Sequence, residues 1–229
     1  MALLGSGVLA IWNGIADTAE AEFVRWHVRE HIPERVGLPG FLCGRRYAAV
    51  DGHPKYFNFY ETASTEVLNS RVYRDRLNNP TPWTRRVVGE FRNTTRTICD
   101  VVASHGLGTG AWIETIRLGA VTDDDEFRRA LLQHHLPAVI ATDGIVAMHL
   151  LRGSEPEKSA GTAESALRSQ PDRTAAWIIL VESVDEHPLR TLRNGEISDE
   201  NLRACGARSD IERGIYRLQF ALARAELPA

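Results

Sequence analysis

Two histidines and a glutamate stand close together in the run His27-Val-Arg-Glu-His31. On a helix, His27 and His31 are four residues apart and Glu30 is three from His27, so the three side chains occupy adjacent positions. Histidine titrates near neutral pH and serves often as a general acid or base. Because His27 follows Phe23 by four residues, it lies near the core-facing stripe. We predict proton transfer by His27 with His31 beside it; a histidine satisfied in the core is the alternative.

The same run fits the pattern H-x-x-E-H of inverted zinc peptidases. That chemistry needs a third protein ligand and a much larger architecture, and the sequence shows neither. Cys43, Cys99 and Cys205 have no C-x-x-C spacing, which argues against a thiolate zinc site and against a disulfide framework. We therefore predict a site without a metal and without a cofactor.

A second group of polar side chains alternates along the predicted strand Tyr56 to Glu61. Tyr56, Asn58 and Tyr60 point to one face of this strand, and Phe57 and Phe59 point to the other. The polar face could orient a carbonyl or phenol and stabilise an enolate. The alternative is packing, with each hydroxyl reaching a main-chain group.

Two arginines and a tryptophan are further candidates. Arg45 and Arg46 are adjacent on a strand, so only one of them faces a given pocket; we favour Arg46 as a partner for a carboxylate or enolate, against a surface salt bridge. The loop Asn78-Asn-Pro-Thr-Pro-Trp83 is stiff and could be a pocket lid with Trp83 as its inner wall. The alternative is a loop before a helix, whose tryptophan fills the edge of the core.

An internal repeat shows which elements position these residues. At a constant offset of 104, six residues recur: Glu22, Phe23, Arg25, His31, Pro33 and Gly40 match Glu126, Phe127, Arg129, His135, Pro137 and Gly144. The strand Tyr56 to Glu61 matches Trp177 to Glu182 at an offset of 121. The difference indicates an insertion within residues 154–174, whose composition predicts an exposed, mobile loop. The survival of His135 also suggests a structural role for His31.

Each half has the same predicted order of elements, β-α-β-β-α-β, which is the ferredoxin-like unit. Pro33 and Pro137 are expected to end the regular part of the first helices. The second helical stretches run over Thr65–Asn78 and roughly Ser198–Arg213. The predicted strands are Val8 to Asn13, Phe41 to Tyr47, Tyr56 to Glu61, Thr95 to Ala103, Trp112 to Leu118, Ile145 to Leu151, Trp177 to Glu182 and Ile215 to Ala223.

A single ferredoxin-like sheet has helices on one face and leaves the other face bare. A second copy in the same chain can cover that face. We predict an α+β fold in which residues 1–106 and 107–229 form two fused units, joined by the glycine-rich linker around Gly106 to Gly110, whose antiparallel sheets pack into an intramolecular α+β barrel.

The run WHVREHIPERVGLPGFLCGRRY has a His-x-Pro at the helix end and Leu-Pro-Gly-Phe before a strand. It resembles the dimeric α+β barrel superfamily, most closely its EthD-like and antibiotic-biosynthesis-monooxygenase-like members. The resemblance covers nearly the whole chain as two tandem copies, and it is weaker in the second, where Asp143 replaces Pro39. Similar proteins bind small, often aromatic or polyketide-like molecules between helices and sheet. They include cofactor-free oxygenases, cyclases, isomerases, haem-dependent enzymes and members without known activity, so the fold does not select the chemistry.

The two halves differ where a pocket would lie. The first half has Trp26, His27, Glu30, Arg46, Tyr47, Tyr56, Asn58 and Tyr60, whereas the second has Ala130, Leu131, His134, Leu150, Leu151, Trp177, Ile179 and Val181 at the matching positions. Residues that serve the fold alone should be similar in both halves. We therefore predict a pocket in the first half and a scaffold in the second; the alternative is drift among structural hydrogen bonds.

Composition limits the partners. Of the 229 residues, 43% are hydrophobic and 25% are charged, as in an ordinary globular protein. The net charge of -3 gives no basic field for nucleic acid. No stretch is long and apolar enough to span a membrane. We expect a cytoplasmic protein, a monomer or homodimer, whose partner is a small organic ligand.

These observations lead to a hypothesis about function. The chain would be a cofactor-free enzyme of isomerase, cyclase or oxygenase type that acts on an aromatic, lactone or polyketide-like compound. His27, His31, Tyr60 and Arg46 would be catalytic, and Trp26, Glu30, Tyr47, Tyr56, Asn58 and Trp83 would bind the substrate. Two alternatives stay open: a non-catalytic small-molecule-binding or stress-response protein, and a haem-binding barrel.

Overall fold

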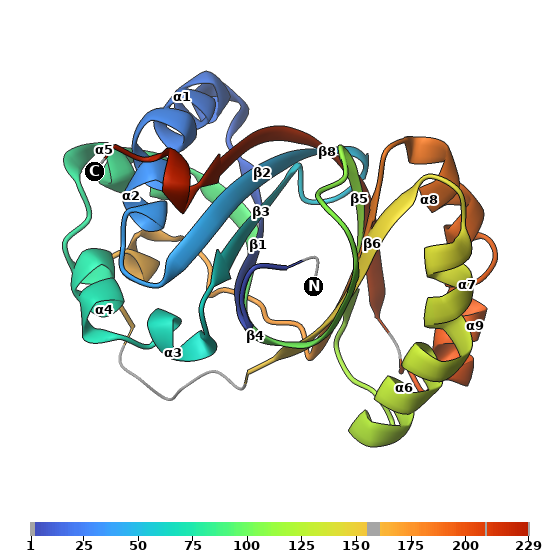
Figure 1. The fold of residues 1–229 in the computed structure, drawn as a ribbon. Coiled ribbons are helices and arrows are strands. Elements are labelled where there is room, and N and C mark those ends of the chain that lie inside the picture. Colours follow the sequence, from blue (N-terminus) through green and yellow to red (C-terminus); the bar gives the residue numbers. More distant parts are fainter. Residues whose placement is uncertain (1–2, 155–160, 209, 229) are drawn as a thin grey trace.

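The computed structural model describes residues 3–154, 161–208 and 210–228. Their eight strands close into an antiparallel barrel in the order β1-β3-β2-β8-β5-β7-β6-β4 (Figure 1). The strands are β1 (Gly7–Ile15), β2 (Phe41–Gly52), β3 (Tyr56–Thr62), β4 (Phe91–Gly106), β5 (Trp112–Leu118), β6 (Ile145–Gly153), β7 (Trp177–Ser183) and β8 (Ile211–Ala223). The predicted α+β class with a barrel inside one chain is confirmed.

Each half of the chain contributes four neighbouring strands to this barrel. The first half runs β4-β1-β3-β2 and the second runs β8-β5-β7-β6, so the order is the same in both. The two sets join where β2 pairs with β8 and where β4 pairs with β6. Closure pairs the edge strands that each four-stranded sheet would otherwise expose.

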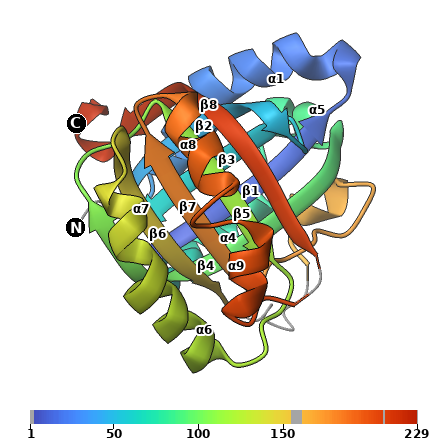
Figure 2. The same ribbon diagram turned by 90° about the vertical axis from the view of Figure 1, so that its right-hand side faces the viewer.

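The helices lie outside the barrel. Those of the first half are η1 (Asp17–Ala19), α1 (Glu20–Trp26), η2 (His27–His31), α2 (Ile32–Val36), α3 (Thr65–Leu68), α4 (Arg71–Asn78) and α5 (Pro82–Val88). Those of the second half are α6 (Asp124–Ala130), η3 (Leu131–His135), α7 (Leu136–Ala141), η4 (Ser165–Leu167), α8 (Glu186–Arg193), α9 (Asp199–Ala204) and η5 (Arg224–Glu226). Helices α1 to α5 cover one side of the barrel, and α6 to α9 cover the opposite side (Figures 1 and 2). Within the described residues, every helix is too short or too polar to cross a membrane.

The second helical region of the second half differs from the prediction. Helix α9 ends at Ala204, and residues from Ile211 onward belong to β8 instead of the predicted helix. The strand begins early because Ile211 pairs with Leu118 at the end of β5. Helix α8, which precedes the predicted stretch, was not foreseen. Strand pairing has overridden the local helical pattern here.

A π-helical turn interrupts the first long helix of each half, at His27–His31 and at Leu131–His135. The prediction that Pro33 and Pro137 end these helices is wrong, since α2 and α7 continue beyond them. A proline inside a helix lacks an N–H donor, and its ring crowds the carbonyl four residues earlier. The wider π turn just before each proline gives that carbonyl room. The turn is therefore a feature of the fold rather than of one site.

The glycine that repeats in both halves has a backbone reason. Gly40 and Gly144, which lead into β2 and β6, both have a φ of 85°. This left-handed region favours glycine because a side chain there is strained. A Cβ at Gly40 would also lie only 2.5 Å from Val67.

The barrel interior is a packed core with a charged cluster inside it. Trp12 stacks on Phe57 with ring centroids 4.6 Å apart, among other apolar side chains from both halves. Arg45 pairs there with Glu61 of β3 and, at 3.0 Å, with Glu182 of β7. These two glutamates are the matching residues of the repeat, so one arginine joins the two halves inside the barrel.

The insertion of the second half reaches the first half. We expected residues 154–174 to be exposed; residues 169–171, 173 and 174 are exposed, but residues 161–168 contact the first-half helices, and residues 155–160 lie outside the described residues. The Glu164 N–H donates to the Leu77 carbonyl oxygen of α4 at 3.0 Å. Leu167 packs against the cluster that contains Phe23 and Trp26. Figure 1 shows this orange segment beside α2 and α4.

Candidate functional site

Three predicted catalytic residues meet between the first-half helices and the outer face of the barrel. His27 and His31 lie at the two ends of the π turn η2, and Tyr60 lies on β3. The Tyr60 hydroxyl is 3.2 Å from His27 Nε2, and the two imidazole rings stack with centroids 5.4 Å apart. The exposed fractions are 2% for His27, 7% for His31 and 1% for Tyr60. The structure thus joins a base, a second imidazole and a phenol in a buried group.

Aromatic rings enclose both imidazoles. The Phe23 ring stacks on His27 at a centroid distance of 5.2 Å, and the Trp26 ring lies 4.2 Å from that of His31. Trp26 is therefore an apolar neighbour of the group, and its predicted contact with a substrate stays a prediction. The rings leave the histidines little contact with water.

This burial keeps the imidazoles neutral. Desolvation lowers the pKa of His27 well below its ordinary value of 6.5, and the positive charges of Arg46 and Arg35 lower it further. Burial and Arg35 likewise lower the pKa of His31. Burial raises the pKa of Tyr60 above its ordinary value. At neutral pH the group therefore contains unprotonated imidazoles beside a protonated phenol.

Each histidine keeps one ring nitrogen for a ligand. The Nδ1 atoms of His27 and His31 are buried and have no hydrogen-bond partner within the described part of the chain. Buried polar atoms are usually satisfied, so such atoms are often found at functional positions. A bound molecule could supply the missing partner.

Two guanidinium groups flank the histidines. Arg46 faces the helix layer, where its Nη1 donates to the Val24 carbonyl oxygen at 3.2 Å. Arg35 of α2 is only 2% exposed and lies 5.8 Å over the Tyr73 ring. Sequence analysis missed Arg35. Comparison at the offset of 104 would have found it, because its counterpart is the buried apolar Val139.

Tyr56 and Asn58 share the face of Tyr60, but their polar groups bind the protein. The Tyr56 hydroxyl donates to Glu20 Oε1 at 2.8 Å, and Asn58 Nδ2 donates to Asn13 Oδ1 at 2.7 Å. Asn58 Oδ1 has no partner among the described residues. Asn58 therefore keeps one free acceptor, whereas Tyr56 ties β3 to the first turn of α1.

Glu30 and Trp26 attach helix α5. Glu30 Oε1 accepts hydrogen bonds from the hydroxyls of Thr81 at 2.6 Å and Thr84 at 3.2 Å, and Trp26 Nε1 donates to the Thr84 hydroxyl. Trp83 lies in the first turn of this short helix and packs against the cluster around Phe23. The predicted lid loop is thus partly a helix, and Glu30 anchors that helix rather than facing the histidines.

Tyr47 does not belong to this group. It points into the barrel interior, on the face of the sheet opposite to Tyr60, and Arg45 Nη1 lies 3.5 Å from its hydroxyl. We correct its predicted grouping with His27. The reason is strand alternation: Tyr47 shares its parity with Arg45, and Arg46 has the other.

The histidines do not assemble into a metal site. Residues 3–154, 161–208 and 210–228 contain no group of three or more His, Cys, Asp or Glu side chains placed to hold a metal ion. Haem ligation through His27 Nε2 fits poorly as well, because aromatic rings cover the faces of this imidazole and Tyr60 occupies Nε2. A haem ligand needs an imidazole nitrogen that faces a space as large as the macrocycle.

Surface cavities lie away from the histidines. One of about 170 Å³ and one of about 350 Å³ are at one end of the barrel and share Arg173 in their walls. A third, of about 160 Å³, lies beneath the insertion between α4 and β4. None of these three is lined by His27, His31 or Tyr60. These three cavities therefore give no direct access to the two histidines and Tyr60.

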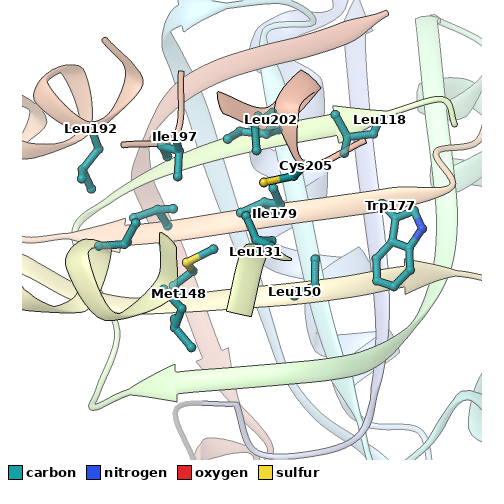
Figure 3. Close-up of a cluster of buried hydrophobic side chains, with 14 of the residues drawn as sticks. Leu118, Leu131, Met148, Leu150, Trp177, Ile179, Leu192, Ile197, Leu202 and Cys205 are labelled. Carbon is teal, nitrogen blue, oxygen red and sulfur yellow. The ribbon is translucent and has the colours of Figure 1, made fainter. Parts of the chain in front are cut away.

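The matching region of the second half is an apolar core. Leu131, Leu150, Ile179 and Val181 replace the polar residues of the first half, and Figure 3 shows most of the surrounding cluster. His135, the counterpart of His31, instead lies near the surface with its Nδ1 2.8 Å from Glu196 Oε1. The repeat thus conserves the position of this histidine but not its surroundings.

Solved structures with the same fold include three that match almost the full chain. An anthrone oxidase-like protein has a TM-score of 0.67 at 14% identity, covering 96% of this chain and 93% of that chain. A proposed monooxygenase from Fusobacterium nucleatum has a TM-score of 0.59 at 10% identity, covering 96% of each chain. A proposed monooxygenase from Lactobacillus acidophilus has a TM-score of 0.57 at 10% identity, covering 96% and 97%.

These likenesses show the fold alone. No protein-family model matches the sequence, and no curated protein matches it. Membership in the EthD-like or antibiotic-biosynthesis-monooxygenase-like groups stays a prediction, and so does an origin by tandem duplication. The class that the structure defines is a mixed α+β protein with a closed eight-stranded barrel.

Proposed function

We propose that the protein is a small-molecule enzyme in which His27 removes a proton from an aromatic, lactone or polyketide-like compound without a cofactor. The observation that carries this proposal is the buried pair of His27 Nε2 and the Tyr60 hydroxyl, enclosed by aromatic rings. A neutral imidazole has a lone pair available, and a water-poor site strengthens its hydrogen bonds to a substrate. Residues 1–106 would form the ligand-binding half, and residues 107–229 the scaffold.

The flanking cations suit the charge that proton removal creates. When a base takes a proton from carbon next to a carbonyl, negative charge develops on the oxygen. Arg46 and Arg35 already act on His27 through their positive charge, and the same charge would stabilise an enolate or phenolate. Tyr60 would pass the proton between His27 and the substrate, and the proton would return at another atom in an isomerisation. His31 would position the His27 ring by stacking.

Anthrone is a suitable first probe, because one structural relative is described as anthrone oxidase-like. Its CH₂ group is acidified by the ring carbonyl, and loss of a proton there gives an aromatic enolate. The test measures deuterium uptake at that carbon in D₂O by NMR, without oxygen. We expect the protein to accelerate uptake and His27→Asn to slow it by about 100-fold or more.

Two further variants control this experiment. Tyr60→Phe removes the hydroxyl but keeps the ring, so it should slow uptake while the protein stays folded. His135→Asn alters the matching histidine of the second half and should leave uptake unchanged. Equal uptake with and without the protein would remove anthrone as a substrate, and equal uptake by the wild type and His27→Asn would overturn the assignment of His27. Saturable binding without exchange would favour a non-catalytic binding protein.

A further inference from the structure

A buried ion pair between the two halves closes the candidate site. Glu164, in the insertion, binds Nη2 of Arg35 in helix α2. The exposed fractions are 6% for Glu164 and 2% for Arg35, so the contact is almost free of water. The two residues are far apart in the sequence, and the pair brings a second-half carboxylate to the helix layer that holds His27.

The charges of Arg35 and Glu164 act on the residues of the candidate site. Arg35 is among the charges that lower the pKa of both His27 and His31. Burial opposes the charge of Arg35, but the carboxylate of Glu164 keeps the Arg35 pKa above its ordinary value. Glu164 also acts on Tyr60. The carboxylate therefore neutralises a cation that faces the proposed reacting group.

Few other contacts hold the insertion on the first half at this point. The Ala163 N–H donates to Asn78 Oδ1 at 3.1 Å, and the Glu164 N–H donates to the Leu77 carbonyl. Leu167 adds an apolar contact. The ion pair is the main charged attachment of residues 161–168, so its exchange for another anion would release that stretch. Arg173 would stay paired with β4, because its N–H donates to the Thr94 carbonyl oxygen at 3.0 Å.

A cavity of about 160 Å³ lies directly beneath the insertion. Its walls combine two arginines with hydroxyl groups; they are Leu77, Arg96, Gly161, Thr162, Ser165, Arg168 and Asp172. Arg168 Nη2 is 3.8 Å from Glu164 Oε1, and Arg168 Nε is buried without a partner in the described chain. The guanidinium groups of Arg35 and Arg168 thus both lie beside the Glu164 carboxylate, and Arg168 also pairs with Asp172 at 2.7 Å.

The free-energy cost of leaving Arg35 without a counter-ion limits what can break its ion pair with Glu164. A buried guanidinium that loses its closest counter-ion is disfavoured, because its desolvation is less well compensated. Arg35 has a second carboxylate, Glu34, at 3.2 Å, but Glu34 is already bound to Arg76 at 2.5 Å. Displacement of Glu164 therefore requires a ligand that brings its own negative group.

We propose that Arg35 is the anion receptor of the site, that Glu164 occupies the place of a ligand carboxylate, and that residues 161–168 form a lid that aromatic carboxylates hold open. This inference rests on the proposed function, because it names the substrate class of the same site. An aromatic ring would enter beside Tyr60 and His27, and its carboxylate would bind Arg35.

Benzoate and benzamide are matched probes for this proposal, because they have the same shape and differ in charge. Calorimetric titration should show binding of benzoate but not of benzamide to the wild type. Glu164→Gln removes the competing charge and keeps the side-chain size, so it should bind benzoate at least about tenfold more tightly, the effect of one charged hydrogen bond. Arg35→Met should abolish binding. Glu186→Gln removes an exposed carboxylate from α8 and should leave binding unchanged.

A second measurement uses only the wild-type protein, in case Glu164→Gln unfolds. Benzoate should accelerate amide hydrogen exchange at residues 161–168 and benzamide should not, because the Glu164 N–H loses its bond to Leu77. Equal binding of the two probes, or protection of the lid by benzoate, would overturn the proposal. The double variant His27→Asn with Glu164→Gln should bind benzoate tightly yet exchange no anthrone protons. The lid and the proton transfer can thus fail independently.

Discussion

The helix layers on the two sides of the barrel share a π turn at matching positions, but they bury different kinds of side chain. Around η3 the second half buries a continuous apolar cluster, whereas around η2 the first half buries two histidines and two arginines among aromatic rings. Both layers use a π turn at the same offset of 104 residues. The second half therefore shows what the fold requires. Polar residues present only in the first half cost desolvation free energy, which a functional role would explain.

Two of the residue pairs that are identical in both halves have structural roles. Phe23 and Phe127 are fully buried under their helices, and Gly40 and Gly144 share the same left-handed φ. His31 and His135 are the exception, since one is buried against Trp26 and the other binds Glu196 near the surface. Identity of sequence between the halves thus indicates the fold, and difference indicates the site.

The largest expected effect concerns Arg45, which pairs with the matching glutamates of the two halves, Glu61 and Glu182. Arg45→Met leaves both carboxylates buried without their cation, so the free energy of unfolding should fall by about 3–5 kcal/mol. Denaturation by urea measures this loss. Arg152→Met, which removes an exposed partner of Asp124, should lower it by less than about 1 kcal/mol. Similar losses in the two variants would show that the interior cluster does not join the halves.

An exchange of residues between the halves should have the next largest effect. Leu131→His places an imidazole in the apolar core, where Val181 stands in place of Tyr60, so stability should fall by about 1–3 kcal/mol. The reciprocal His27→Leu should change stability by less than about 1 kcal/mol while abolishing deuterium uptake by anthrone. Urea denaturation and NMR test both parts. A large stability loss in His27→Leu would make His27 a structural residue.

The sequence predicted much of this comparison. Strand alternation put Tyr56, Asn58 and Tyr60 on one face, and the offset indicated that the first half has polar residues where the second half has apolar ones. It could not reveal Glu164 beside Arg35, because ion pairs between distant segments depend on how the insertion packs. It also grouped Tyr47 with Arg46, although adjacent residues of a strand point to opposite faces. The early start of β8 escaped prediction because pairing with β5 decides it.

The pH dependence of stability should also differ between the halves. Above pH 6.5 the buried histidines are neutral in both the folded and unfolded chain, so stability is complete. As the pH falls below 6.5, the unfolded chain binds protons that folded His27 and His31 refuse, because their pKa is lowered. The free energy of unfolding should then fall by up to about 1.4 kcal/mol per pH unit for each histidine.

His27→Leu tests this dependence, because it gives the first half the residue that the second half has. Urea denaturation between about pH 7 and pH 5 should show a slope reduced by one proton relative to the wild type. Identical slopes would mean that His27 takes up a proton in the folded protein. The neutral base that the proposed reaction needs would then be lost below pH 6.5.

The smallest expected effect concerns a contact that both halves share. Glu20 accepts from the Tyr56 hydroxyl and pairs with Lys55, and the matching Asp124 accepts from Trp177 Nε1. Glu20→Gln and Asp124→Asn should each lower the free energy of unfolding by about 1 kcal/mol, because each replaces a charged acceptor by a neutral one. Neither should alter deuterium uptake by anthrone, since both contacts tie a strand to the first turn of a helix. If Glu20→Gln changed uptake and Asp124→Asn did not, Tyr56 would belong to the site, and the division between shared structural residues and unmatched functional ones would have to be redrawn.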